Sequence, residues 1–295
     1  MDQRSSPRRL HPISTARGDK VKILGLVGSH RRLGNTEVLV REIMRGAAAE
    51  TNVEETVVRL TDCALLPCKG CMACVLKGED CRIDDDVPRV FAALEEHDAL
   101  VLGAPTYLLA PSAPVKMVMD RLLTLFPKSE GFKGKRAATV AVGGLPNWDP
   151  FSIPLLNAFV LVLQYDLAGW LAAYAPGPGQ VLMDEDVVRR ANLLGRALAN
   201  ASVEYVSDES GKRCTICGGE GFRYLSGRER NGIEVQCPVC LAKGVISDGK
   251  VKMDAAHHRF KEEALTEHFF GWIMRTGEMY FKHRDEIDKR KRRYA

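Results

Sequence analysis

The stretch VKILGLVGSHRRLGNTE, residues 21–37, predicts a strand, a tight turn and the start of a helix. Residues 21–27 are a short apolar run of the kind found in buried strands. Residues 28–36 then combine glycines, hydroxyl side chains, the amide of Asn35 and two arginines. Backbone N–H groups at a helix start, together with such side chains, can cradle a phosphate. An ordinary capping turn explains the stretch equally well, and the missing G-x-G-x-x-G spacing disfavours a dinucleotide.

The alternation of strand and helix patterns continues to about residue 206. Short β-rich apolar runs are expected to form strands at 21–27, 54–60, 99–103, 137–142 and 169–174. Helical periodicity falls between them, at 36–50, 87–97, 112–126, 152–165 and 185–204. This order predicts an α/β fold in three layers, a doubly wound parallel five-stranded sheet covered by helices. Such sheets bind ligands beyond the carboxyl ends of their strands, in the loops after the first, third and fourth strands.

The loop after the third expected strand reads GAPTYLLAPSAPVKMVMDRL, residues 103–122. Pro105, Thr106 and Tyr107 lie where backbone amides can face the edge of a planar ring. Together with residues 28–36, this loop resembles the flavodoxin-like, NADPH-dependent FMN reductase family. That family has a GS-x-R-x-x-GNT loop and a G-[SA]-P-x-Y…K-x-x-x-DR segment. The resemblance covers roughly residues 21–205 and implies a flavodoxin-like fold with bound FMN.

The same resemblance implies which residues hold FMN. The first loop would bind the phosphate, the second would lie along the isoalloxazine ring, and a loop after the fourth strand would meet the other ring edge. These residues are Ser29, Arg31, Gly34, Asn35 and Thr36 for the phosphate, Pro105, Thr106 and Tyr107 along the ring, and Gly143 and Gly144 at its edge. Core packing or loop support is the alternative role for Tyr107. Asp120 and Arg121 are expected to form a structural ion pair or a partner contact, and no side chain is expected to be catalytic because the cofactors carry the reaction.

Eight of the nine cysteines fall into two groups with different spacings. The first group lies in PCKGCMACVLKGEDCRIDDD, residues 67–86. A subset of the FMN reductase family, the iron-sulfur flavoproteins, carries such a run after the second strand. The resemblance therefore implies a 4Fe-4S cluster on Cys68, Cys71, Cys74 and Cys81. From the residues alone, thiols at every third position can converge only if the loop wraps around a common metal centre. Either an iron-sulfur cube or one zinc ion could bind these four thiolates. Reduced thiols left from an ancestral site are the remaining alternative, and Cys63 is expected to be a small buried side chain.

The second group consists of the pairs Cys214/Cys217 and Cys237/Cys240. Nineteen residues separate the two pairs, inside the zinc-ribbon window of roughly 15–20 residues. We expect all four thiolates to hold a structural zinc ion, with a rubredoxin-like iron site as the alternative. The surrounding residues 207–250 are rich in Gly, Cys and charge, and a module this small needs a metal to fold. It is not part of the common flavoprotein pattern.

Charge and composition indicate how the chain is divided into segments. The net charge is +4, with basic ends around a slightly acidic body. We expect a disordered basic tail at 1–20, a flavodoxin-like FMN-binding domain at 21–206, the four-cysteine zinc-ribbon module at 207–250 and a helical extension with a basic end at 251–295. An apolar stripe predicts that this extension docks on the body or on a second subunit. Its members are Phe260, Leu265, Phe269, Trp272 and Ile273.

The compartment follows from the thiols and from the lack of long apolar segments. The longest apolar stretches, such as 155–163, are too short for a bilayer, which needs about 20 residues. No membrane insertion is therefore expected. Clustered cysteines without a signal peptide predict a reducing compartment, the cytoplasm.

The predicted function is electron transfer by a flavin- and 4Fe-4S-dependent oxidoreductase that links two-electron and one-electron redox partners. NAD(P)H or a ferredoxin-like redox protein is the expected electron partner. The resemblance implies a homo-oligomer, a dimer or tetramer, in which cluster and flavin meet across a subunit interface. One alternative is an NAD(P)H-dependent FMN or quinone reductase whose cysteines are vestigial. Another is a nucleic-acid or protein-binding module using the zinc ribbon and basic tails, but few aromatics accompany those tails and nucleic acid is not expected.

Overall fold

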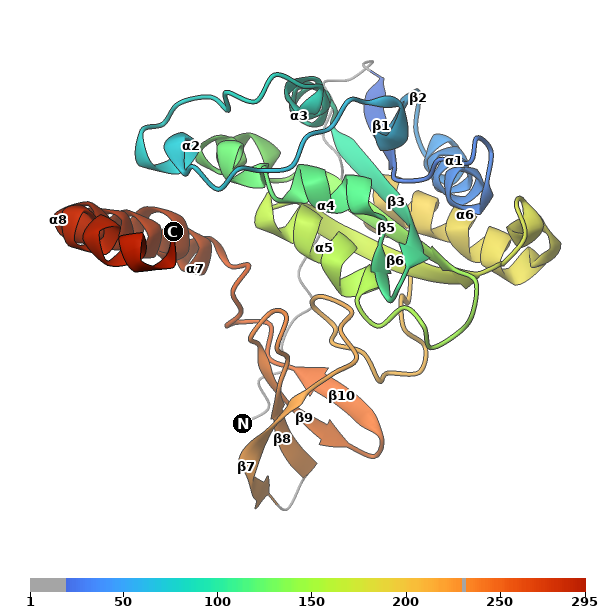
Figure 1. Cartoon of the computed structure of the whole chain (residues 1–295). Coiled ribbons are helices and arrows are strands. Elements are labelled where there is room, and N and C mark those ends of the chain that lie inside the picture. Colours follow the sequence, from blue (N-terminus) through green and yellow to red (C-terminus); the bar gives the residue numbers. More distant parts are fainter. Residues whose placement is uncertain (1–19, 230–231) are drawn as a thin grey trace.

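A parallel sheet forms the centre of the computed structural model, which describes residues 20–229 and 232–295 (Figure 1). Its path runs in the order β2-β1-β3-β5-β6. The strands are β1 (Val21–Val27), β2 (Val53–Arg59), β3 (Ala99–Tyr107), β5 (Arg136–Gly143) and β6 (Asp166–Tyr174). This is the flavodoxin-like order, in which the direction of winding reverses between β1 and β3. The predicted three-layer parallel sheet is confirmed, and a short sixth strand, β4 (Ala110–Pro111), pairs antiparallel with β3.

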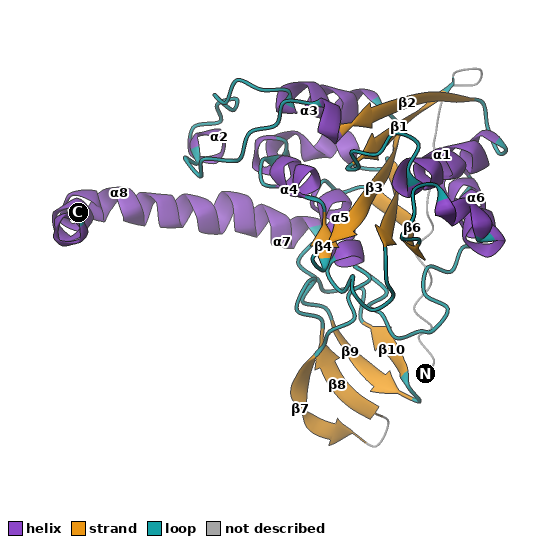
Figure 2. Ribbon diagram, turned by 45° about the vertical axis from the view of Figure 1, so that its right-hand side comes forward, coloured by secondary structure: helices purple, strands orange, loops and turns teal. Residues whose placement is uncertain are grey.

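Helices cover both faces of the sheet because successive strand residues point to opposite sides. Leu24 and Leu26 pack under α3 (Val87–Glu96), α4 (Ala113–Met119) and α5 (Ser152–Val162). Ile23 and Val27 pack on the other face, under α1 (Asn35–Ala48) and α6 (Glu185–Ala199). The two layers of helices are visible in Figures 1 and 2.

The helix predicted over 112–126 is wrong in its second half. Regular helix ends at Met119, and two 3-10 segments follow, Leu122–Thr124 and Phe126–Phe132. The chain leaves the regular helix at Arg121, whose backbone angles (φ −104°, ψ 1°) lie outside the helical region and whose side chain is buried, with only 2% of the residue exposed.

The C-terminal third adds a small sheet and a helical arm. The sheet is antiparallel in the order β10-β9-β8-β7. Its strands are β7 (Arg223–Glu229), β8 (Gly232–Gln236), β9 (Lys243–Ser247) and β10 (Lys250–Met253). The arm consists of α7 (Glu262–Thr266), a π-helical turn (Glu267–Ile273) and α8 (Met274–Lys291). Figure 2 shows α8 extending away from the sheet.

The predicted apolar stripe of this arm is correct except at one position. Leu265, Phe269 and Ile273 are buried together against Phe126, whereas Trp272 is 53% exposed. The π-helical turn winds more slowly than an α-helix and so rotates Trp272 off the buried face. The predicted tail 1–20 lies outside the described residues apart from Lys20. Within the part of the chain that the structure describes, no helix is long and apolar enough to cross a membrane.

Candidate functional site

The loops after β1 and β3 lie against each other at the point where the strand order reverses. The backbone N–H of Gly28 donates to the carbonyl of Gly103 at 2.8 Å. The Ser112 hydroxyl, at the start of α4, donates to the carbonyl of Gly28 at 2.6 Å. A Cβ at Gly28 would lie 2.7 Å from Val115, so the close approach requires glycine. A doubly wound sheet binds its ligand at this point.

Side chains at the end of β2 and just after it orient the phosphate loop, residues 28–36. Thr61 donates to the carbonyl of Ser29 at 3.0 Å, and Arg59 donates to the carbonyl of His30 at 3.0 Å. In a planar trans peptide the N–H points opposite to the C=O. The N–H groups of His30 and Arg31 are therefore turned away from β2, and that of Arg31 donates to the Ser29 hydroxyl at 3.2 Å.

The N-terminus of α1 completes an anion cradle. Gly34 is the N-cap, with no side-chain capping hydrogen bond, so the first N–H groups of the helix lack the partners that a cap supplies. The Ser29 and Thr36 hydroxyls are buried beside it. Arg31 is exposed and has no ion pair among the described residues, whereas Arg32 pairs with Asp62 at 3.3 Å. This combination fits a phosphate dianion.

Glu37 is a supporting residue that the sequence reasoning missed. Its carboxylate is buried, accepts from the N–H of Leu33 at 2.9 Å, and pairs with Arg41 at 2.9 Å and Arg59 at 2.5 Å. Burial acts to raise the pKa of Glu37, but hydrogen bonds from Leu33 and Arg41 lower it overall. A glutamate three residues after the N-cap is the capping-box position, which was the available signal.

Asn35 occupies the predicted loop, but its side chain is already in use. It donates to the carbonyls of Ala175 and Gly177, both at 2.8 Å, and accepts from the N–H of Val181 at 3.1 Å. These bonds tie the start of α1 to the segment after β6. Contact between Asn35 and a phosphate would therefore come from its backbone N–H.

The predicted flavin loop forms a hairpin between β3 and β4. Thr106 and Ser152 share a hydroxyl hydrogen bond of 2.7 Å, and the N–H of Phe151 donates to the carbonyl of Leu109 at 3.1 Å. Pro105 lies beside Val142 in the sheet. Tyr107 is 55% exposed, which argues against the core-packing role.

Exposed apolar side chains lie on this hairpin and on the loop between β5 and α5. A Cβ at Gly143 would lie 3.2 Å from the Tyr174 ring, and Gly144 follows it into the loop. The exposed side chains, called here the apolar rim, are Tyr107, Leu108, Leu145, Trp148 and Phe151. A flat aromatic ring is the kind of ligand that such a rim accommodates.

The first cysteine group lies in the loop of residues 67–86, called here the cysteine loop, on the side that carries α3 and α4 (Figures 1 and 2). Cys68 and Cys71 are exposed, and Cys74 and Cys81 are partly buried. Burial raises the pKa of Cys74, and the nearby thiolates of Cys71, Cys81 and Cys68 add to this effect. Among the described residues, these sulfur atoms do not gather within 4.8 Å as a single ion would require. A four-iron cluster takes each thiolate at a different iron and spreads its ligands more widely.

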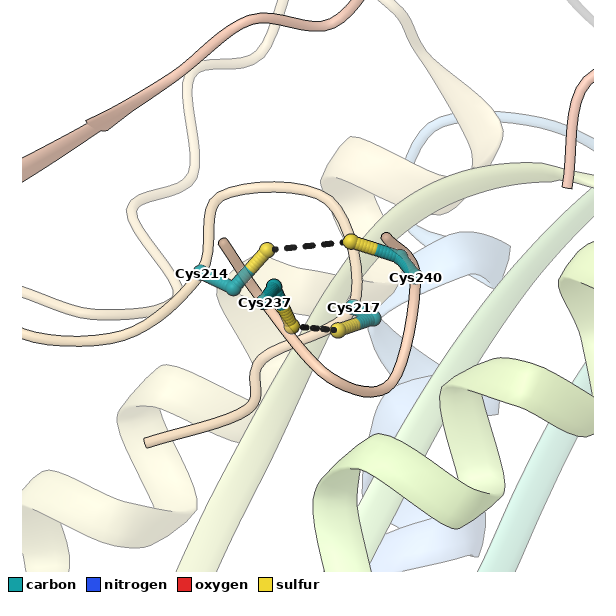
Figure 3. A group of neighbouring side chains, drawn as sticks. All are labelled: Cys214, Cys217, Cys237 and Cys240. Atoms are coloured by element: carbon teal, nitrogen blue, oxygen red, sulfur yellow. Dashed lines mark hydrogen bonds between the residues drawn. The ribbon is translucent and has the colours of Figure 1, made fainter. Parts of the chain in front are cut away.

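The second cysteine group is compact and buried (Figure 3). The four sulfur atoms lie within 4.8 Å of one another. Cys214 and Cys240 are 3.5 Å apart, as are Cys217 and Cys237. Thiolates at about 2.3 Å from a tetrahedral zinc ion stand about 3.8 Å apart, so this group, called here the four-cysteine site, fits one metal ion. Hydrogen bonds with Cys214 and the other sulfurs, together with burial, raise the pKa of Cys217.

Comparison with known proteins agrees with this geometry. Residues 21–147 match the model of the NADPH-dependent FMN reductase family. An iron-sulfur flavoprotein of Methanocaldococcus jannaschii is 40% identical over 190 residues, which are 61% of this chain and 96% of that protein. An iron-sulfur flavoprotein of Methanosarcina thermophila is 32% identical over 128 residues, 43% of this chain and 65% of that one.

Two further similarities extend through the C-terminal third. The flavone synthase cfoJ of Aspergillus candidus is 28% identical over 286 residues, 84% of each chain. The solved structure of a flavone reductase superposes with a TM-score of 0.70 at 17% identity, covering 93% of this chain and 96% of that one; at this identity it shows a shared fold. The identity of 40% across almost the whole of an iron-sulfur flavoprotein decides the family. This chain belongs to the iron-sulfur flavoproteins and is a flavin-dependent oxidoreductase.

Proposed function

We propose that this protein holds FMN and a 4Fe-4S cluster and transfers electrons between a two-electron donor and a one-electron partner. When bound, FMN exchanges electrons in pairs or singly, and the cluster exchanges them one at a time. The observation that carries the proposal is the short helix α4, which joins the two sites. Ser112 at its start bonds to the phosphate loop, and Arg121 just after its end pairs with Asp85 of the cysteine loop.

The residues around the sheet edge divide the binding of FMN between them. The buried Ser29 and Thr36 hydroxyls, the backbone N–H of Asn35 and the guanidinium of Arg31 would hold the phosphate. Gly34 would shape the turn beside it, because its own N–H donates to the carbonyl of Arg31 at 3.1 Å. The hairpin residues Pro105, Thr106 and Tyr107 would lie along the ring, with Gly143 and Gly144 at its other edge. No acid or base from the protein is required, because the protein positions the flavin and sets its surroundings.

The two cysteine groups have different roles in this proposal. Cys68, Cys71, Cys74 and Cys81 would bind the cluster, and the exposure of Cys68 and Cys71 supports electron exchange with a ferredoxin-like protein or with the flavin of a second subunit in a homo-oligomer. The four-cysteine site would hold structural zinc. None of the nine cysteines, all of which lie among the described residues, forms a disulfide, which supports a reducing compartment such as the cytoplasm. NAD(P)H is the expected two-electron donor.

Cofactor analysis of the anaerobically purified protein tests this proposal. We expect bound FMN, zinc, iron with acid-labile sulfide, and an EPR signal after reduction. Cys71→Ser together with Cys74→Ser should abolish the iron and the EPR signal while FMN remains bound. Cys63→Ser is the matched control and should leave both cofactors in place. A colourless wild-type protein without iron would rule the proposal out.

A second candidate function is the reduction of a flat aromatic ketone such as a flavone, with NADPH as the two-electron donor. The apolar rim favours it, because Trp148 is 59% and Phe151 is 53% exposed beside the expected ring site. The similarity to a flavone synthase over 84% of each chain points the same way. Flavone-dependent oxidation of NADPH under anaerobic conditions would support this activity, and Trp148→Ala should raise KM more than it lowers kcat. Phe281→Ala, on α8, is the control and should leave KM unchanged. If flavone does not raise the rate of NADPH oxidation by the wild type, this function is excluded.

A further inference from the structure

A buried side-chain amide on α5 links the four-cysteine site to the central sheet by hydrogen bonds. Asn157 on α5 is fully buried. Its Nδ2 donates to the carbonyl of Cys217 at 3.2 Å, and its Oδ1 accepts from the Thr139 hydroxyl at 2.5 Å. Thr139 lies on β5 and is also fully buried. A buried amide bonded on both sides fixes its partners, because each lost bond would leave a polar group unsatisfied.

The knuckle that carries Cys217 rests directly on the same helix. Gly218 has a φ of +73°, and a Cβ there would lie 2.5 Å from Ile153 and 3.2 Å from Trp170. Ile153 is on α5 and Trp170 is on β6, and both are buried in the core. The backbone of the metal knuckle is therefore packed against the flavodoxin-like core with no space between them.

The first residues of α5 hold the expected flavin loops. Ser152 bonds to Thr106 of the hairpin, and the N–H of Phe151 bonds to Leu109. The buried Asp149 accepts from the Tyr174 hydroxyl at 3.1 Å. Burial, with the charge of Asp149, raises the pKa of Tyr174 to about 12, so this hydroxyl stays a donor. Asn157 lies less than two helical turns from Ser152.

We propose that Asn157 is a positioning residue that couples metal binding at the four-cysteine site to flavin binding at the hairpin. Metal binding fixes Cys217 and its carbonyl, Asn157 transmits this constraint to α5, and α5 fixes Thr106 and Leu109. Loss of the metal would release the knuckle, since neighbouring buried thiolates need a cation. The hairpin would then bind FMN less tightly. This inference rests on the proposed binding of FMN and of zinc.

Removal and return of zinc test the coupling in the complete chain. FMN affinity is measured by flavin fluorescence in the purified protein, after chelation, and after zinc alone is added back. We expect chelation to weaken FMN binding by about 5- to 150-fold, the usual range of such couplings, and added zinc to restore it. Thermodynamic linkage requires FMN to raise zinc affinity by the same factor.

Variants locate the coupling at Asn157. Asn157→Ala with zinc bound should bind FMN as weakly as the stripped wild type, and chelation should then change little. Asn192→Ala is the matched control, because Asn192 donates to Glu42 from α6 at 2.8 Å, away from the flavin loops. Gly218→Ala should likewise weaken FMN binding, whereas Gly249→Ala, also at positive φ but with nothing within 4 Å of its Cβ, should not.

The outcomes separate this inference from the proposed function. If the wild type binds no FMN or no zinc, the proposed function fails. If it binds both, and FMN affinity is the same with and without zinc, the coupling alone is overturned. If removal of zinc unfolds the protein, the zinc-bound Asn157→Ala variant provides the test. The coupling is overturned if that variant binds FMN as tightly as the wild type does.

Discussion

The carboxylate of Asp85 and the guanidinium of Arg121 form an ion pair in which each side chain is 1% exposed. Asp85 also accepts from the N–H of Leu66 at 2.8 Å and of Val87 at 3.2 Å. Leu66 precedes the cysteine loop and Asp85 lies near its end. The ion pair therefore closes the base of the cysteine loop onto the chain just after α4.

Removal of one partner should open this base. Arg121→Leu leaves Asp85 as a buried charge without its cation, and such changes cost about 3–5 kcal/mol. We expect a matching loss in the free energy of unfolding and faster loss of iron from the cysteine loop. Lys116→Leu is the control, because the Lys116–Asp120 pair is about half exposed and exposed pairs contribute about 0–1 kcal/mol. Equal effects of the two variants would contradict a special role for the buried pair.

The stabilisation of the phosphate loop by Glu37 should be lost in acid. Its pKa is lowered from the ordinary value of 4.5 in the folded chain, so the folded state binds this proton less readily than the unfolded state. The stabilisation is complete above 4.5 and is lost as the pH falls through the lowered pKa. In Glu37→Gln that contribution is absent at every pH. Denaturant unfolding at several pH values should give the wild type a larger free energy of unfolding than the variant near neutral pH, and similar values for both in acid. A difference that does not change with pH would contradict this prediction.

Asn35 should matter more for loop structure than for direct contact with phosphate. Asn35→Ala leaves the carbonyls of Ala175 and Gly177 without their donor, and each unsatisfied buried group costs about 1–3 kcal/mol. We expect lower stability of the FMN-free protein, measured by denaturant unfolding. Arg31→Ala should instead leave that stability unchanged and weaken FMN binding, since Arg31 is exposed. If Asn35→Ala reduced FMN affinity alone, a direct contact would be the better explanation.

Local sequence patterns predicted most of the fold but few of the contacts between its elements. The strand, turn and helix of residues 21–37 and the paired spacing of the four-cysteine site are short-range features, and the structure forms both. Contacts such as Arg121 with Asp85 or Asn157 with Cys217 join residues 36 and 60 positions apart. No periodicity encodes them, because they depend on how the elements pack. The same reason explains why the hairpin at β4 and the rotation of Trp272 were missed.

The arm should depend on one stacked aromatic pair. Phe126 and Phe269 stack with ring centroids 3.7 Å apart, and both are buried. Loss of a buried phenylalanine costs about 3–5 kcal/mol. Because α8 reaches the body mainly at α2 (Ala73–Leu76) of the cysteine loop, Phe269→Ala should release α7 and α8 before the sheet unfolds. Limited proteolysis should then cut the arm early.

The release of the arm should also expose the cysteine loop. Cys71 and Met72 line a cavity of about 630 Å³ with Trp272, Tyr280 and other arm residues. Cys74 lies in α2, which α8 contacts, and it is partly buried. In Phe269→Ala we therefore expect thiol reagents to modify Cys74 faster in the cluster-free protein. Met279→Ala is the control, since Met279 lies on α8, is 63% exposed and does not line this cavity, so its loss should leave proteolysis and thiol modification unchanged. If Phe269→Ala lowers global stability without early cleavage of the arm, the arm unfolds together with the sheet, and it is an integral part of the fold.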